Sequence, residues 1–121
     1  MSFPGSYNIS YYKGDTLEFR VYPKNSAGAA FDLGDYGTAK FTISTARGTD
    51  GVANQIEAYA EIPSDDTTYV LCVIRPSDGA QLVSGTSYVY DVEVSKTATP
   101  YPYVYTLLTG NITVTDQVTG A

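Results

Sequence analysis

The sequence contains no histidine, no tryptophan and a single cysteine. Without histidine it lacks the usual general base of a Ser-His-Asp or Cys-His arrangement and the usual neutral nitrogen ligand of zinc. The lone Cys72 excludes a disulfide within the chain, and it lies in the apolar run of residues 69–74. A buried thiol there behaves as a small hydrophobic side chain, and its isolation is typical of cytosolic synthesis. The composition predicts no enzyme, no cofactor and no metal site.

Charge is scarce as well, because charged side chains make up only 17% of the residues and the formal net charge is -6. The lysines and arginines occur singly, so the sequence has no positive stripe of the kind that nucleic acid or an anionic membrane requires. No apolar run approaches the roughly 18 residues that a membrane span needs. The first residues lack the basic and apolar segments of a secretory signal. We therefore expect neither nucleic acid nor a membrane as a partner.

Hydrophobic alternation is the clearest positive signal, and residues 84–94 show it best. One parity is tyrosine and valine, whereas the other is acidic. The apolar set is Tyr88, Tyr90, Val92 and Val94, and the acidic set is Asp91 and Glu93. A period of two places these sets on opposite faces of a half-buried β-strand. The segment predicts a strand of an antiparallel sheet.

The rest of the chain repeats this pattern in short segments separated by Gly, Pro and Asp turns. Further strands are predicted at residues 7–12, 16–22, 38–45, 55–62, 67–74, 103–108 and 111–115. Gly110 between the last two predicts a bulge or bend within one long strand. About eight strands at this spacing, with no helix of any length, predict an all-β sandwich or barrel. We expect residues 1–121 to form a single domain.

Paired carboxylates are the remaining chemical candidates. Asp91 and Glu93 share one strand face, but every i, i+2 pair on a strand does so, and we interpret them as a solvated outer face rather than as a hydrolase pair. Asp32, Asp35 and Asp50 are loop carboxylates that offer oxygen ligands for calcium. They lack the dense Asp-x-Asp-x-Asp-Gly order of a calcium loop, so no metal ligand is predicted.

Tyrosine is the residue in excess, with twelve in the chain. Tyr101, Tyr103 and Tyr105 share one parity of a Pro-interrupted hairpin. Exposed, these rings form a contact patch for protein or sugar; otherwise they cover the open end of the core with their hydroxyls in water. Further contact candidates are Tyr7 and Tyr11 in the first strand, which is a candidate edge for strand addition, and Tyr36 in the long connection of residues 23–37. The loop tip at residues 48–54 is a third expected contact region.

Several segments, taken in order, resemble a known family. They are Lys-Gly-Asp-Thr-Leu at residues 13–17, Phe-Asp-Leu-Gly-Asp-Tyr at 31–36 before the strand at 38–43, residues 84–92, and residues 107–119. In this order the chain resembles the immunoglobulin-like domains of tailed-bacteriophage virion proteins, especially the N-terminal domains of baseplate upper proteins. The resemblance implies an immunoglobulin-like antiparallel β-sandwich of about seven to eight strands. Tyr88 then becomes a tyrosine corner, and Tyr90 takes the core place that a cystine fills in antibody domains.

The same resemblance implies a non-enzymatic structural role in a virion, with other virion proteins as partners and multiple copies in a symmetric assembly. The chain is then made in the host bacterial cytoplasm and resides in the particle. The resemblance leaves open whether that place is the capsid surface, neck, tail, baseplate or a fibre adaptor. The alternative is a glycan-binding adhesion module in which exposed tyrosines stack on sugar faces.

Overall fold

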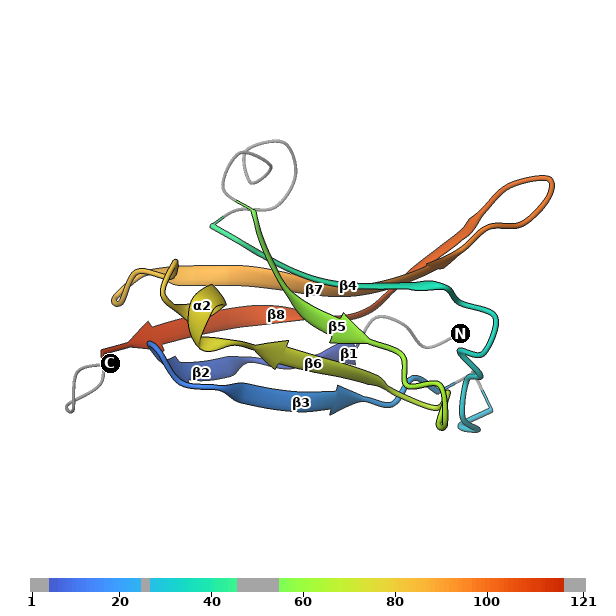
Figure 1. Ribbon diagram of the computed structural model, residues 1–121, viewed down its shortest axis with the longest axis horizontal. Helices are drawn as coiled ribbons and strands as arrows, with labels where there is room; N and C mark the ends of the chain where they lie inside the picture. Colours follow the sequence, from blue (N-terminus) through green and yellow to red (C-terminus); the bar gives the residue numbers. More distant parts are fainter. Residues whose placement is uncertain (1–4, 25–26, 46–54, 117–121) are drawn as a thin grey trace.

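The computed structural model describes residues 5–24, 27–45 and 55–116 (Figure 1). Its regular elements are β1 (Gly5–Ser6), β2 (Ile9–Tyr12), β3 (Leu17–Val21), β4 (Thr38–Ser44), β5 (Ile56–Glu61), β6 (Val70–Ile74), α2 (Pro76–Gly79), β7 (Ser87–Lys96) and β8 (Tyr103–Thr115). The all-β prediction is confirmed. The Pro-Ser-Asp-Gly segment after β6 forms a single helical turn, α2.

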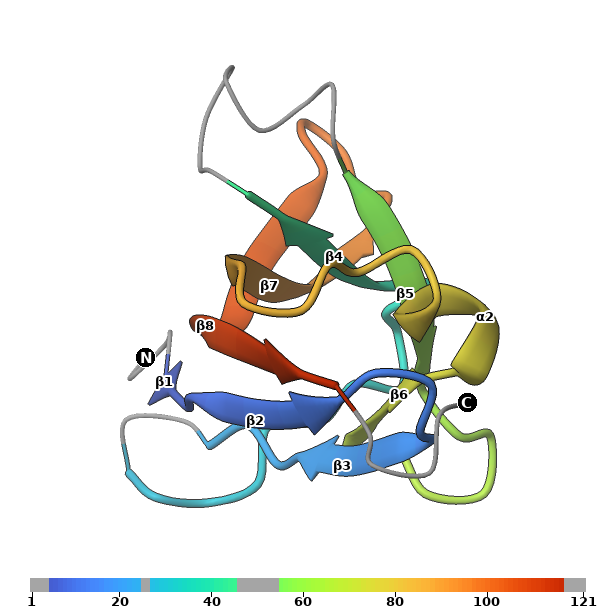
Figure 2. The ribbon, with the colours of Figure 1, turned by 90° about the vertical axis from the view of Figure 1, so that its left-hand side faces the viewer.

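The strands form one curled sheet in the order β1-β8-β7-β4-β5-β6-β3, with β2 also paired to β8. The curl brings β2 and β3 next to each other, although no strand pairing joins them in the described residues (Figures 1 and 2). The turn of the sheet lies at β5, whose first half pairs with β4 and whose second half pairs with β6. The molecule is therefore a curled, half-barrel-like sheet.

The prediction of a purely antiparallel sheet is wrong, because the sheet is mixed. Both β1 and β2 run parallel to β8, with Gly5 opposite Leu108 and Ile9 opposite Ile112. Local alternation shows that a segment is a strand but not which distant strand it joins. The chain turns sharply after β2, and β2 pairs with the last strand instead of with β3.

Side-chain parity otherwise follows the sequence. In β7 the tyrosine and valine parity is buried, as predicted, whereas the acidic parity, expected as a solvated outer face, is half-buried. An aromatic cluster joins three strands of the curl: the half-buried Phe19 of β3 packs against the buried Phe41 of β4 and Tyr90 of β7. The Phe19–Phe41 ring centroids are 5.4 Å apart and the Phe41–Tyr90 centroids 5.5 Å, both edge to face. Edge-to-face aromatic pairs add about 0.5–1.5 kcal/mol beyond area burial, so this cluster ties distant parts of the curl together.

Strand β8 is continuous over thirteen residues, as expected, but its bulge is not at Gly110. The register with β7 shifts where Val92 pairs with Leu108 and Glu93 with Thr106, so Leu107 is the extra residue. Gly110 is needed for a different reason. A Cβ there would overlap the backbone carbonyl oxygen of Tyr7, and the ring of Tyr90 is also close.

Tyr88 makes the hydrogen bond expected of a tyrosine corner. Its ring is buried, and its hydroxyl accepts a bond of 2.8 Å from the backbone N–H of Val83, five residues earlier. Tyr90 is buried in the core, and its hydroxyl donates to the backbone carbonyl of Tyr7 at 2.6 Å. Two tyrosines on the core-facing side of β7 thus hold two backbone segments, one beside β7 in sequence and one near the start of the chain.

Candidate functional site

A row of five aromatic rings and one lysine runs from the loop before β4 to the tip of the β7–β8 hairpin. We call it the aromatic row; its members are Phe31, Tyr36, Lys96, Tyr101, Tyr103 and Tyr105. Each neighbouring pair of rings lies in contact range, from 5.6 Å between the centroids of Tyr101 and Tyr103 to 6.4 Å between those of Tyr103 and Tyr105. The structure thereby brings together four of the six tyrosines that the sequence predicted as contact residues.

The bulge at Leu107 explains why these tyrosines face the same side as the core. After the bulge the buried residues of β8 are even-numbered, whereas before it Leu107 and the half-buried Tyr105 are odd-numbered. Tyr105 lies opposite the buried Val94, and Tyr103 lies opposite Lys96. Tyr103 and Tyr105 therefore lie on the same side of the hairpin as the core residues, but farther toward its tip.

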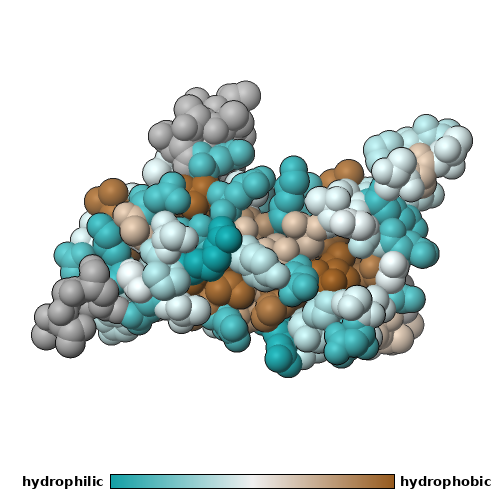
Figure 3. All heavy atoms as spheres, in the orientation of Figure 1, coloured by the Kyte–Doolittle hydropathy of each residue, from teal (hydrophilic) through white to brown (hydrophobic). Residues whose placement is uncertain are grey.

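The hairpin itself projects from the body of the molecule, at the upper right of Figures 1 and 3. Its core-facing side consequently has less of the fold to cover it toward the tip. Exposure rises along the row, from 8% at Tyr36 to 36% at Tyr103 and 60% at Tyr101. The sequence left two interpretations of these rings open. The inner rings of the row cover the end of the core, whereas the outer rings, Tyr101 and Tyr103, are exposed and available for contact with a partner.

Lys96 sits between two rings of the row. Its Nζ atom lies 4.9 Å from the ring centroid of Tyr36 and 5.1 Å from that of Tyr103. A cation over an aromatic face is attracted by the ring quadrupole. Lys96 therefore links the buried end of the row to its exposed end and restrains the ring of Tyr103.

The chemistry of the row is that of contact. Burial, together with the neighbouring Tyr105, Tyr103 and Asp35, raises the pKa of the Tyr36 hydroxyl above its ordinary value, so this hydroxyl stays protonated at neutral pH. No member of the row is a carboxylate. The row offers hydroxyls, ring faces and one cation, which suit binding of a partner surface.

The other predicted contact residues lie elsewhere. Tyr7 is 52% exposed and lies beside Phe19, with ring centroids 6.0 Å apart, away from the aromatic row. Tyr11, the other contact candidate of the first strand, is only 2% exposed, so its ring lies in the core and does not face a partner. Its hydroxyl donates to the backbone carbonyl of Asp15 at 2.7 Å, and its ring packs on Gly79 of α2. The ring of Tyr36 is likewise buried and supports the row from below instead of meeting a partner directly.

The carboxylates are placed in structural roles or on the outer face. Asp32 accepts hydrogen bonds from the Thr67 hydroxyl at 2.8 Å and the Gly34 N–H at 2.9 Å, which hold two loops together and lower the pKa of its carboxyl. Glu93 lies opposite Lys40, and Asp91 opposite Thr42, on the half-buried side of β7. Among residues 5–24, 27–45 and 55–116, no group of three or more metal-ligating side chains occurs. Asp50 and the loop tip at residues 48–54 lie outside the described residues.

Cys72 is fully buried, and burial raises the pKa of its thiol from 9.0 to about 12. A thiol in that state is a poor nucleophile, because the thiolate is the reactive form. Its side chain is part of the hydrophobic core, as the sequence predicted.

Sequence reasoning missed two members of the row, Phe31 and Lys96. Phe31 is 6.0 Å from Tyr105, centroid to centroid, across 74 positions of sequence, and no local pattern indicates such a contact. Lys96 does carry a signal, because it shares the even parity of Tyr88 to Val94. Continuing the strand by one more alternation places Lys96 on the core-facing side.

A comparison with models of protein families finds none that matches this chain, and a comparison with curated proteins finds no match. In the part of the chain that the structure describes, no helix has the length and apolar character to cross a membrane.

Proposed function

We propose that the protein is a non-enzymatic structural module of a tailed-phage particle that contacts neighbouring virion proteins through the exposed end of the aromatic row. One observation carries this proposal: Tyr101 and Tyr103 stand exposed on a projecting hairpin and are supported from behind by buried rings. Tyrosines that are rigidly held and partly apolar are favoured anchors of protein interfaces. The segment-by-segment resemblance supplies the virion setting.

The strand pairing supports the finer proposal that the curled sheet is an immunoglobulin-like sandwich. In such domains two sheets face each other, and a tyrosine near the start of one strand bonds upstream backbone. Here the faces meet through Phe19, Phe41 and Tyr90, and the Tyr88 hydroxyl makes the upstream bond. In this interpretation β5 is the corner strand that passes from one sheet to the other.

The packing of the rings favours a protein partner over a sugar. The rings of Tyr103 and Tyr105 are stacked at an interplanar angle of 21°. The Nζ atom of Lys96 also lies over the ring of Tyr103. Tyr101 is tilted by 60° from Tyr103, so the two exposed rings do not form one flat platform. Sugar stacking needs open and accessible ring faces, whereas a protein interface uses ring edges and hydroxyls as well.

Modest contacts suffice in a symmetric particle. Each copy adds the same contact, and contacts made within one assembly benefit from a high effective concentration. The proposed partners are therefore other virion proteins, with several copies of this chain per particle. The capsid surface, neck, tail and baseplate are all compatible with this mode of attachment.

The test is incorporation into particles of the phage that encodes the chain. Mass spectrometry of purified particles should find the wild-type chain at a fixed copy number. A Tyr101→Ala, Tyr103→Ala double variant should be incorporated at least about tenfold less, since hot-spot truncation costs about 2 kcal/mol or more per residue. Wild-type chain found only as free monomer in the lysate would overturn the proposal.

The matched control is Val104→Ala. Val104 is 53% exposed and lies between the two row tyrosines Tyr103 and Tyr105, but on the other parity of β8. It should be incorporated like the wild type. A glycan array probed with purified wild type and Tyr103→Ala separates the alternative, because sugar binding that depends on Tyr103 would indicate an adhesion module instead.

A further inference from the structure

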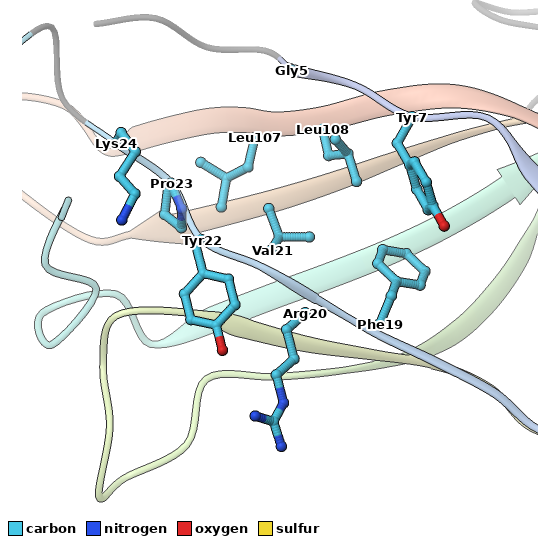
Figure 4. Close-up of a pocket in the computed structure, with 10 residues that line it drawn as sticks. All are labelled: Gly5, Tyr7, Phe19, Arg20, Val21, Tyr22, Pro23, Lys24, Leu107 and Leu108. Atoms are coloured by element: carbon cyan, nitrogen blue, oxygen red, sulfur yellow. The ribbon is translucent and has the colours of Figure 1, made fainter. Parts of the chain in front are cut away.

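A groove of about 480 Å³ lies between β1 and β3, the two strands at the ends of the sheet order (Figure 4). Its floor is apolar and consists of Phe19, Val21, Leu107 and Leu108. It shares no residue with the aromatic row. The groove thus separates the two end strands of the curled sheet, which do not pair with each other in the described part of the chain.

The groove runs along β3. Tyr7 and Phe19 meet across one part of it with ring centroids 6.0 Å apart. The other lining residues extend from this contact to Tyr22, Pro23 and Lys24 (Figure 4). An elongated occupant can therefore lie along β3 between Tyr7 and Lys24.

The wall formed by β3 is an edge of the sheet. All five residues of β3 pair with β6 on one side, and within the described residues no strand pairs with its other side. The edge available for pairing ends at Tyr22, because Lys24 already forms a bridge with Ala30, and the carbonyl of Pro23 accepts from the Phe31 N–H at 3.0 Å. Such an edge carries a row of main-chain N–H and C=O groups that can pair with an added strand. On the opposite wall β1 is also an edge, because its only described strand partner is β8.

The charged residues that line the groove are positive, although the chain as a whole is acidic, so the groove favours an acidic occupant. These residues are Arg20 and Lys24, with no carboxylate among the lining residues, in a chain of net charge -6. Phe19 and Val21 point toward Leu107 and Leu108, whereas Arg20 points outward from β3, away from that floor (Figure 4). Its guanidinium lies over the ring of Tyr69, 5.0 Å from the ring centroid, and its charge stays exposed on the outer side of β3. A strand added beside β3 would alternate in the same way, with apolar side chains over the floor and outward side chains beside Arg20.

We propose that this groove binds an extended peptide segment of a partner protein, which adds to the free edge of β3. The segment has apolar side chains at alternate positions and an acidic side chain that pairs with Arg20. Its apolar side chains lie over Phe19 and Leu108, the half-buried members of the floor, because Val21 and Leu107 are already buried in the fold. Opposite charges at directly facing strand positions contribute about 0.2–1 kcal/mol, so the acidic residue sets preference and the main-chain bonds set position.

A single extended segment fits better than a second copy of the chain. β3 of another copy is joined to β6 and brings a whole sheet with it. On the opposite side the groove is bounded by β1 and Tyr7. A volume of about 480 Å³ is of the size that holds a small ligand or a few residues of peptide.

The experiment uses a display library of random peptides about ten residues long, selected on the intact protein. Enriched peptides should alternate apolar residues and carry an acidic one. Added to isotopically labelled protein, such a peptide should shift the NMR amide signals of β1 and β3. The same peptide methylated at its backbone nitrogens should lose binding, because it can no longer donate to a strand edge.

Charge reversal tests the role of Arg20. The exposed Arg20→Glu variant should bind the acidic peptide about fivefold more weakly, as expected for loss and reversal of an exposed ion pair. Lys40→Glu, the same charge change on β4, should leave binding unchanged. The proposal is overturned by failure to enrich any peptide, by equal binding of the methylated peptide, or by amide shifts confined to the β7–β8 hairpin. Concentration-dependent dimerisation that blocks the groove would assign it to a second copy instead.

Discussion

At the scale of single residues, this fold depends on a few close approaches between side chains and backbone. Gly110 is the tightest, because β8 passes directly beneath the carbonyl of Tyr7 and the ring of Tyr90. The glycine is required for space. The lack of a side chain at this one position lets β8 pass both groups.

Gly110→Ala should therefore destabilise the protein by about 2–3 kcal/mol, since an inserted methyl group in a packed site forces backbone and side chains apart. Urea unfolding followed by circular dichroism measures the change. Gly37→Ala is the control, because a Cβ at Gly37 meets nothing within 4 Å. Equal effects of the two substitutions would contradict the close approach at Gly110.

Tyr88→Phe should cost about 1 kcal/mol, because it removes the acceptor of the Val83 N–H while keeping the ring in the core. The free energy of unfolding in urea reports this loss. Tyr12→Phe removes a hydroxyl from a ring that is 56% exposed and should change stability by less than about 0.5 kcal/mol. A Tyr88→Phe protein as stable as the wild type would show that the corner bond contributes nothing.

At the scale of elements, α2 shows how one helical turn can hold a connection. The Asp78 carboxylate is buried and accepts bonds from the Arg75 backbone N–H at 3.1 Å and from its Nε at 2.8 Å. Gly79 in the same turn lies against the ring of Tyr11. The turn thereby covers Tyr11 and joins β6 to the start of β7.

Asp78→Ala should lower the free energy of unfolding by about 1–3 kcal/mol, the range for hydrogen bonds that involve a charged group. Ser77→Ala, at an exposed position of the same turn, should have little effect. Differential scanning calorimetry compares the two variants. If both melt with the wild type, α2 is not an anchor of this connection.

The strands were largely predictable from the sequence, and the reasons for the exceptions are physical. Alternation in residues 84–94 predicted the buried set of β7 correctly, since period two is a local property. The bulge was misplaced because Leu107 and Leu108 are the same residue type, so the pattern shows no break there. Tyr11 was a contact candidate because nothing local reveals that α2, more than sixty positions later, covers its ring.

The candidate site was predictable only in part. Shared parity correctly grouped Tyr101, Tyr103 and Tyr105. The contacts of this group with Phe31 and Tyr36 depend on how the long connection folds back, which has no periodic signal. The groove beside β3 was not predictable at all, because it depends on the order of strands in the sheet.

At the scale of the whole molecule, buried acidic groups make stability depend on pH in the alkaline range. Burial raises the pKa of the Cys72 thiol from 9.0 to about 12, and burial also raises the pKa of the Tyr11, Tyr36 and Tyr90 hydroxyls. The unfolded chain therefore loses these protons first. Above about pH 9 the folded state binds more protons than the unfolded state, so stability falls as pH rises.

The free energy of unfolding should change little between neutral pH and about pH 9 and then decrease, with Cys72 alone responsible for at most about 1.4 kcal/mol per pH unit. Urea titrations at a series of pH values measure the slope. Cys72→Val should reduce the slope even where it changes the absolute stability. A thiol reagent should modify Cys72 in the unfolded protein and leave it unmodified in the folded one; rapid modification of the folded protein would contradict its burial.

The parallel pairing of β2 with β8 has a mechanical consequence. Ile9 to Tyr12 lie in register with Ile112 to Thr115. A tension applied between the chain before β2 and the chain after β8 pulls these strands along their length in opposite directions. Their hydrogen bonds are then loaded together in shear and must break together, whereas an antiparallel hairpin opens one bond at a time. The first and last long strands thus form a clamp that resists stretching of the chain.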